Sequence, residues 1–102
     1  MNIREKDQLR IKVLLAIYDK LGVGPSSHGE LLPIAQEQAY LVSGTTEDAE
    51  EALHFWEQRG CFKDQTFGWG GSLSAKGADI AEDLLRQVAA GTEIEPQKRI
   101  GF

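Results

Sequence analysis

Cysteine is nearly absent from this chain: Cys61 is the single one among 102 residues. One cysteine cannot form an intramolecular disulfide, and it removes the structural zinc sites that need two or more thiolates. No apolar run approaches the roughly 18 residues that a membrane-spanning helix needs. The charged residues at the start of the chain also lack the apolar core of a secretory signal. These absences predict a cytoplasmic protein without a membrane span.

Motifs of enzymes and of cofactor-binding proteins are lacking as well. The two histidines, His28 and His54, do not have the spacing of a zinc protease. The glycine-rich stretch 68–71 lacks the Lys-Ser or Lys-Thr ending of a phosphate-binding loop. Cys61 and His54 could form a nucleophile pair, but a small buried residue at the start of a strand is the simpler interpretation of Cys61. We therefore expect no catalytic residue, no metal and no cofactor.

Positive charge is in deficit, since the formal net charge is −5. It is also unevenly placed: residues 1–20 carry five cations against three carboxylates, and residues 46–60 carry five carboxylates against one cation. The sequence thus predicts an acidic patch in the middle of the chain and a basic patch near its start. The candidate basic patch consists of Arg4, Lys6, Arg10 and Lys12.

Apolar residues recur at three- and four-residue intervals in four segments, which predicts four amphipathic helices. We expect the first two over 4–21 and 30–40, the third from Thr45 or Thr46 to about Arg59, and the fourth from Ser74 to Gly91. Ser74 is a good N-cap residue. The expected buried stripe of the fourth helix is Ala78, Ala81, Leu84, Leu85 and Val88.

Two of these helices also carry the sequence pattern of a capping box. Ser27 with Glu30 fits this pattern ahead of the second helix, and Thr45 with Asp48 has the same spacing ahead of the third. In the third helix, Trp56 falls on the apolar stripe and is expected in the core.

Between the third and fourth helices, the pattern is typical of a β-hairpin. Residues 61–66 are extended in character, 67–71 form a glycine-rich turn, and Ser72 begins the return strand. The predicted fold is therefore mainly α with a small β-hairpin, in the order α-α-α-β-β-α of a winged helix-turn-helix. We expect one such domain over 1–91, followed by a tail, 92–102, that is mobile or docks on a partner.

Two segments resemble the winged-helix regulators of the MarR and PadR kind. Residues 52–62, Ala-Leu-His-Phe-Trp-Glu-Gln-Arg-Gly-Cys-Phe, look like the end of their third helix as it enters the first wing strand. Residues 73–79, Leu-Ser-Ala-Lys-Gly-Ala-Asp, look like their junction between wing and last helix, which is usually Leu-Thr-x-x-Gly. The resemblance covers roughly residues 5–90 and implies a DNA-binding transcriptional regulator. A regulator of this kind is expected to act as a homodimer.

The charge pattern opposes that implication. In DNA-binding helix-turn-helix proteins, the second helix of the motif enters the major groove by its N-terminal residues, and lysine and arginine supply most of the attraction to phosphates. Here the corresponding surface is acidic, and the wing adds few cations. The candidate recognition-helix face is Thr45, Thr46, Glu47, Asp48, Glu50 and Glu51, and the candidate wing residues are Lys63, Phe67, Trp69 and Lys76.

The alternative hypothesis is a protein-interaction module that does not bind DNA. It would use the acidic third helix together with Phe67 and Trp69, because large aromatic residues near an exposed turn often anchor protein interfaces. The sequence leaves both hypotheses open, and both describe a protein that is not an enzyme.

Overall fold

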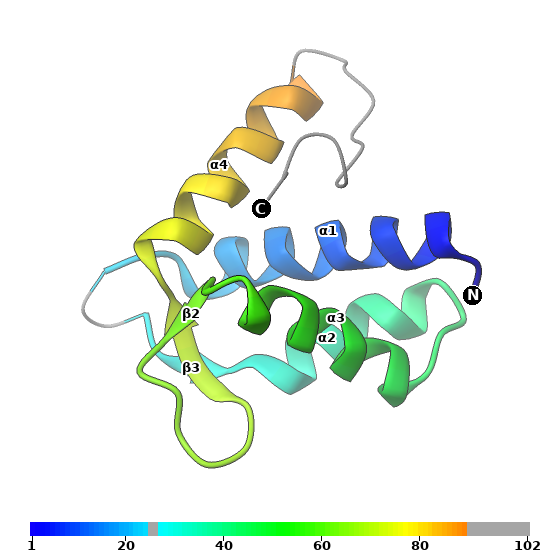
Figure 1. Ribbon diagram of the computed structural model, residues 1–102, viewed down its shortest axis with the longest axis horizontal. Helices are drawn as coiled ribbons and strands as arrows, with labels where there is room; N and C mark the ends of the chain where they lie inside the picture. Colours follow the sequence, from blue (N-terminus) through cyan, green and yellow to red (C-terminus); the bar gives the residue numbers. More distant parts are fainter. Residues whose placement is uncertain (25–26, 90–102) are drawn as a thin grey trace.

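The computed structural model describes residues 1–24 and 27–89. The predicted helix end at Gly91 and the tail 92–102 lie outside these residues. In the described part, four helices pack together and a small sheet of three strands lies at one side of them (Figure 1). The elements are α1 (Ile3–Leu21), β1 (Gly29–Glu30), α2 (Leu31–Leu41), α3 (Thr46–Gln58), β2 (Phe62–Lys63), β3 (Gly70–Leu73) and α4 (Ala75–Ala89). The prediction of a mainly helical fold with a small hairpin is therefore confirmed.

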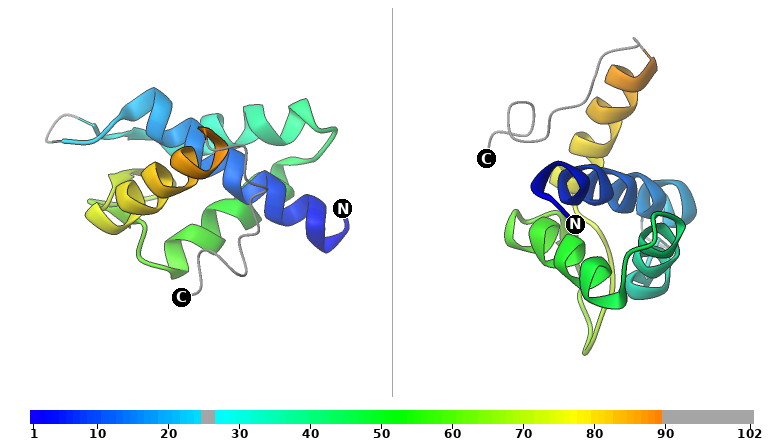
Figure 2. Two further views of the ribbon diagram at one scale, coloured as in Figure 1. Left: turned by 90° about the horizontal axis from the view of Figure 1, so that it is seen from above. Right: turned by 90° about the vertical axis from the view of Figure 1, so that its right-hand side faces the viewer.

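The helix α1 lies at the centre of the arrangement and contacts α2, α3 and α4 (Figure 2). Its apolar stripe supplies the fully buried Val13, Leu14 and Ile17. From α3, Trp56 packs among them with no exposed surface, as predicted, and its indole N–H donates to the Arg10 carbonyl at 2.7 Å. A buried indole needs such a partner, so this bond fixes the distance between α1 and α3.

The predicted capping boxes have different outcomes. The Thr45–Asp48 box is present: the Asp48 N–H donates to the Thr45 hydroxyl, and the Thr45 N–H donates to the Asp48 carboxylate. The Ser27–Glu30 box is wrong. The Ser27 hydroxyl donates instead to the Gly24 carbonyl, and Glu30 takes the N-cap position of α2 without a side-chain bond. The chain ahead of α2 is extended because it pairs with β3.

That pairing makes the sheet larger than the predicted two-stranded hairpin. The strand order is β1-β3-β2, with Gly29 opposite Gly71 and Phe62 opposite Leu73, both antiparallel. A further bond from the Leu31 N–H to the Trp69 carbonyl, 2.8 Å long, continues the connection into the wing loop. A strand of two residues has no periodicity, which is why sequence patterning misses β1.

The last helix begins as predicted. The Ser74 hydroxyl accepts from the Gly77 N–H and donates to the Gly60 carbonyl, so it joins α4 to the end of α3. The predicted burial of Leu85 and Val88 is wrong, because 41% and 53% of their surfaces are exposed. In Figure 1, α4 slants away from α1. Ala81 and Leu84, nearer the start of α4, are therefore buried, and the later apolar residues of the same side are exposed.

Candidate interaction surface

Three candidate recognition residues at the start of α3 make hydrogen bonds within the protein. Thr45 and Asp48 satisfy each other in the capping box. The Thr46 hydroxyl lies 2.7 Å from the Tyr40 hydroxyl and accepts from the Gln36 side-chain amide at 3.3 Å. The capping box gives partners to N–H groups at the start of α3, and the contacts of Thr46 join this start to α2.

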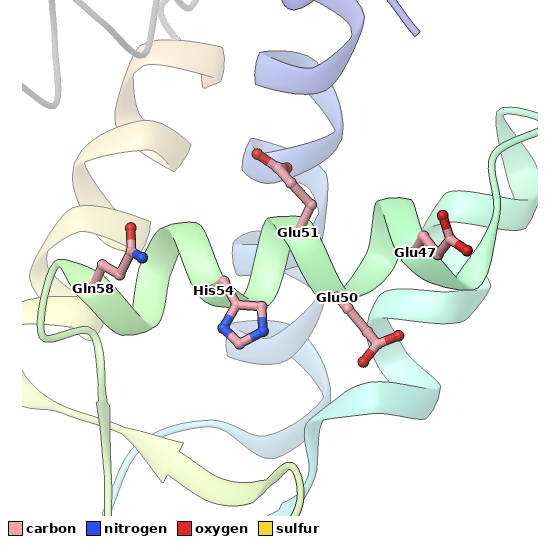
Figure 3. A pocket seen from close by; sticks show the side chains of 5 residues that line it. All are labelled: Glu47, Glu50, Glu51, His54 and Gln58. Atoms are coloured by element: carbon pink, nitrogen blue, oxygen red, sulfur yellow. The ribbon is translucent and has the colours of Figure 1, made fainter.

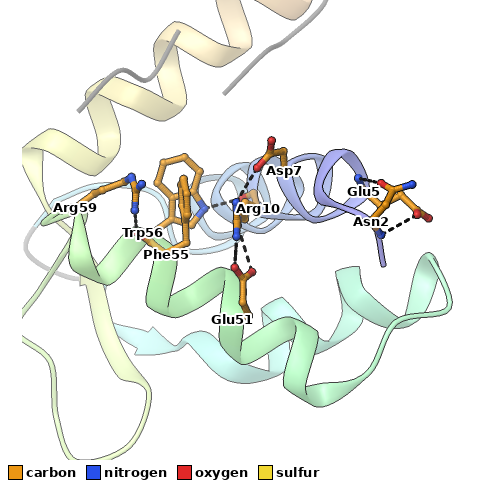
Figure 4. Close-up of polar contacts among 8 residues, drawn as sticks. All are labelled: Asn2, Glu5, Asp7, Arg10, Glu51, Phe55, Trp56 and Arg59. Atoms are coloured by element: carbon orange, nitrogen blue, oxygen red, sulfur yellow. Dashed lines mark hydrogen bonds and ion pairs between the residues drawn. The ribbon is translucent and has the colours of Figure 1, made fainter. Parts of the chain in front are cut away.

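A fourth candidate residue, Glu51, is held by Arg10 of α1 (Figure 4). The Arg10 Nε donates to both Glu51 oxygens at 3.1 and 3.2 Å, and a terminal nitrogen of the same guanidinium also contacts Glu51. The other terminal nitrogen contacts Asp7 at 2.7 Å. Burial by itself would lower the pKa of Arg10, but the hydrogen bonds and charges of Glu51 and Asp7 raise it above its ordinary value.

Phe55 completes this cluster by lying between two guanidinium groups. Arg10 is 4.3 Å and Arg59 is 3.6 Å from the centre of its ring, and Arg59 also donates to the Phe55 carbonyl at 3.0 Å. Such cation–π contacts stabilise both partners. The two arginines nearest α3 are therefore turned toward the protein.

The predicted basic patch does not form one surface. At about 100° per residue along a helix, Arg4 and Lys12 fall on one side of α1, and Lys6 and Arg10 fall on the other. Lys12 is exposed and Lys6 is half-buried. Because Arg10 is engaged by two carboxylates, it adds no net positive charge to either side.

The exposed face of α3 is the candidate surface for a ligand. A shallow, open groove there is lined by Glu47, Glu50, Glu51, His54 and Gln58 (Figure 3). These described lining residues include three carboxylates and no lysine or arginine. The carboxylates splay as expected, with Glu50 and Glu51 on opposite sides of the helix in this view. Within residues 1–24 and 27–89, no group of three or more His, Cys, Asp and Glu side chains is arranged to hold a metal ion.

The two candidate aromatic residues of the wing differ in their exposure to solvent. Phe67 stands fully exposed in the loop between β2 and β3. Trp69 is half-buried and packs against the core, with its ring edge-on to His54 at 4.8 Å between centroids. Glu57 joins the same contact, since it accepts from Gln65 at 2.8 Å and lies 3.3 Å from the His54 Nδ1. The loop between β2 and β3 is thereby joined to α3, and of its two aromatic residues Phe67 is the exposed one.

The two candidate lysines of the wing lie away from its tip. Lys63 is exposed in β2, where it pairs with Ser72 of β3. Lys76 is exposed in the first turn of α4. Neither belongs to the groove on α3.

Sequence patterning missed an exposed apolar end patch, which we define as Met1, Ile3, Tyr40, Leu41 and Val42. Leu41 and Ile3 are 72% and 68% exposed, and Tyr40 is 55% exposed. Met1 reaches the α2–α3 turn, where its Cε lies 2.8 Å from the position of a Cβ built on Gly44. The run Tyr40-Leu41-Val42 was a signal for this patch, but its position at a helix end suggested only a turn.

Cys61 fits its simpler interpretation. Its side chain is fully buried, and burial raises its pKa to about 11, although the charges of Lys76 and Arg59 act in the opposite direction. A thiol of that pKa carries almost no thiolate near neutral pH, so Cys61 is a poor nucleophile.

None of the helices in the described part of the chain is both long and apolar enough to cross a membrane. Comparison with models of known protein families, with curated proteins and with solved structures finds no match.

Proposed function

We propose that this chain is a non-enzymatic winged-helix domain that binds a basic segment of another protein through the exposed face of α3. The observation that carries the proposal is the groove of Glu47, Glu50, Glu51, His54 and Gln58, whose lining has three carboxylates and no lysine or arginine. The helix order, the position of α3 and the loop between β2 and β3 support a winged helix as the scaffold.

The charges on this face favour a protein over DNA. Glu47 and Glu50 would face the phosphates of a duplex that docked on α3, and the contacts of Arg10 leave it unable to offset them. A basic peptide gains from the same two carboxylates. The exposed Phe67 adds an apolar contact at the wing, where a partner can cover an aromatic ring.

A titration on two probes tests the proposal. Labelled mixed-sequence duplex DNA and a labelled synthetic peptide of lysine, alanine and leucine are each titrated with the full chain at low salt, with fluorescence anisotropy as the measurement. We expect the peptide to bind and the DNA not to bind. DNA binding at micromolar protein, falling steeply with salt, would instead make the chain a DNA-binding regulator.

A pair of charge-matched variants identifies the face. Glu47→Gln with Glu50→Gln removes two negative charges from the groove, and we expect it to weaken peptide binding about fivefold. Asp19→Asn with Asp79→Asn removes two negative charges from exposed positions of α1 and α4. If both double variants weaken binding equally, the peptide recognises net charge and the proposed face is wrong.

A further inference from the structure

We infer that the partner segment is a basic amphipathic helix, whose apolar side covers the apolar end patch while its cations meet Glu47 and Glu50. The inference rests on the proposed function and specifies its ligand. It joins two neighbouring features of the surface that are separate in the sequence: the acidic groove on α3, and the patch formed by the start of α1 and the end of α2.

The apolar end patch has the composition of a contact surface. Its side chains come from two elements, and three of them are more than half exposed. Scattered exposed apolar residues are ordinary, and it is their grouping that points to an interaction site. Met1 beside Gly44 brings the start of the chain to the turn that follows Tyr40, Leu41 and Val42. Figure 1 shows that the N-terminus of α1 and the α2–α3 connection lie at the same end of the molecule.

Tyr40 links this patch to the groove. Its hydroxyl lies 2.7 Å from that of Thr46, the residue before Glu47, and Tyr40 as a whole is 55% exposed. Glu50 follows Thr46 by one turn of α3 and lies on the same side of the helix. A ligand that covers Tyr40 therefore reaches both carboxylates without crossing the body of the domain.

The geometry favours a helix as the ligand. From Glu47 to Gln58, the groove follows α3 for about 16 Å, which is roughly three turns of a partner helix. An extended peptide would present one row of alternate side chains to the surface. An amphipathic helix presents a broad apolar stripe with charged residues along its edge, and this matches an apolar patch with carboxylates beside it.

The experiment compares two peptides of identical composition. Both contain lysine, alanine and leucine over about 18 residues, but in one the leucines form a single helical face and in the other they are scrambled. We expect the full chain to bind the amphipathic peptide about tenfold more tightly, because only that peptide can bury leucines on the patch.

Two double variants test which surface of the protein gives the preference for the amphipathic peptide. Ile3→Ser with Leu41→Ser removes two side chains of the patch, and we expect it to abolish the preference for the amphipathic peptide. Val23→Ser with Val88→Ser removes two exposed apolar side chains elsewhere, 54% and 53% exposed, and should leave the preference intact. Circular dichroism melts of both variants check that each is folded.

The other outcomes separate this inference from the proposed function. If both peptides bind equally well, the inference is overturned and the proposed function stands. If neither peptide binds, both fall. If sedimentation finds a dimer that Ile3→Ser with Leu41→Ser dissociates, the patch is occupied by a second copy of the chain, and a peptide partner there is excluded.

Discussion

Arg10 of α1 and Glu51 of α3, 41 positions apart in the sequence, form a paired contact across the interface between the two helices. Each belonged to a different predicted surface, Arg10 to a basic patch and Glu51 to an acidic one. In the folded chain these two opposite charges neutralise each other. The negative charge that the groove presents to solvent is therefore carried by Glu47 and Glu50, beside the side chains of His54 and Gln58.

Replacing Arg10 with Gln should lower the free energy of unfolding by about 2 kcal/mol. The variant would leave Asp7, whose side chain is 8% exposed, without its guanidinium, while Glu51, 37% exposed, would regain water and lose less. Urea denaturation measures the change. Lys12→Gln, an exposed cation on the same helix, should stay within about 0.5 kcal/mol of the unmodified chain. Equal effects of the two variants would mean that the Arg10 pair contributes nothing to stability.

Gly77→Ala should destabilise the protein, although alanine is the better helix former by about 1 kcal/mol. A Cβ at Gly77 would collide with the carbonyl oxygen of Cys61, so α4 would have to move away from the start of the wing. We expect a net loss of about 1–2 kcal/mol, visible as a lower melting temperature. Asp79→Ala, at an exposed position of the same helix, is the control and should be neutral or stabilising. A melting temperature for Gly77→Ala at or above that of the unmodified chain would contradict the close approach.

The two wing aromatics should respond differently to truncation. Phe67→Ala should leave the stability unchanged within about 0.5 kcal/mol, because its ring is fully exposed. Trp69→Ala should cost about 1–3 kcal/mol, because its ring packs on the core and on His54. Chemical denaturation of the two variants, side by side, gives both values. A large loss for Phe67→Ala would place its ring inside the fold.

The thiol of Cys61 should be protected in the folded state and should make stability depend on alkaline pH. Its pKa of about 11 lies above that of an unfolded thiol, so its contribution is complete below about pH 8.5 and is lost as the pH rises through 11. Reaction with a disulfide reagent at pH 8 should be at least about 100-fold slower than in denaturant. Cys61→Ala should reduce the loss of unfolding free energy between pH 8.5 and 11. Fast labelling of the native chain would show that the thiol is accessible.

The helices were predictable because their apolar stripes are long and their starts carry local signals, as Thr45 and Asp48 do. Periodicity identifies which side of a helix faces inward, but it does not say where the body beside that helix ends. For this reason the predicted inward stripe of α4 includes Leu85 and Val88, which are 41% and 53% exposed in the structure. The strand β1 was missed because its partner lies on the far side of two helices in the sequence.

The candidate site was only partly predictable. The exposed carboxylates of α3 follow from helical geometry, but the pairing of Glu51 with Arg10 depends on how α1 crosses α3, which no local pattern encodes. Phe67 and Trp69 are two positions apart, yet one is exposed and the other packs on the core, because the loop between β2 and β3 turns between them. The apolar end patch depends on the meeting of two distant segments, the start of α1 and the end of α2.

The central position of β3 has a consequence for how the chain folds. Gly29 and Gly71, paired across the sheet, are 42 positions apart, and α2 and α3 lie between them. Pairing β1 with β3 therefore closes a loop that contains both helices, and this closure costs conformational entropy. We expect the hairpin of β2 and β3, whose strands are near in the sequence, to form before the long-range pairing of β1 with β3 and the bond from the Leu31 N–H to the Trp69 carbonyl. The pairing of β1 with β3 thus connects the segment ahead of α2 to the strand ahead of α4.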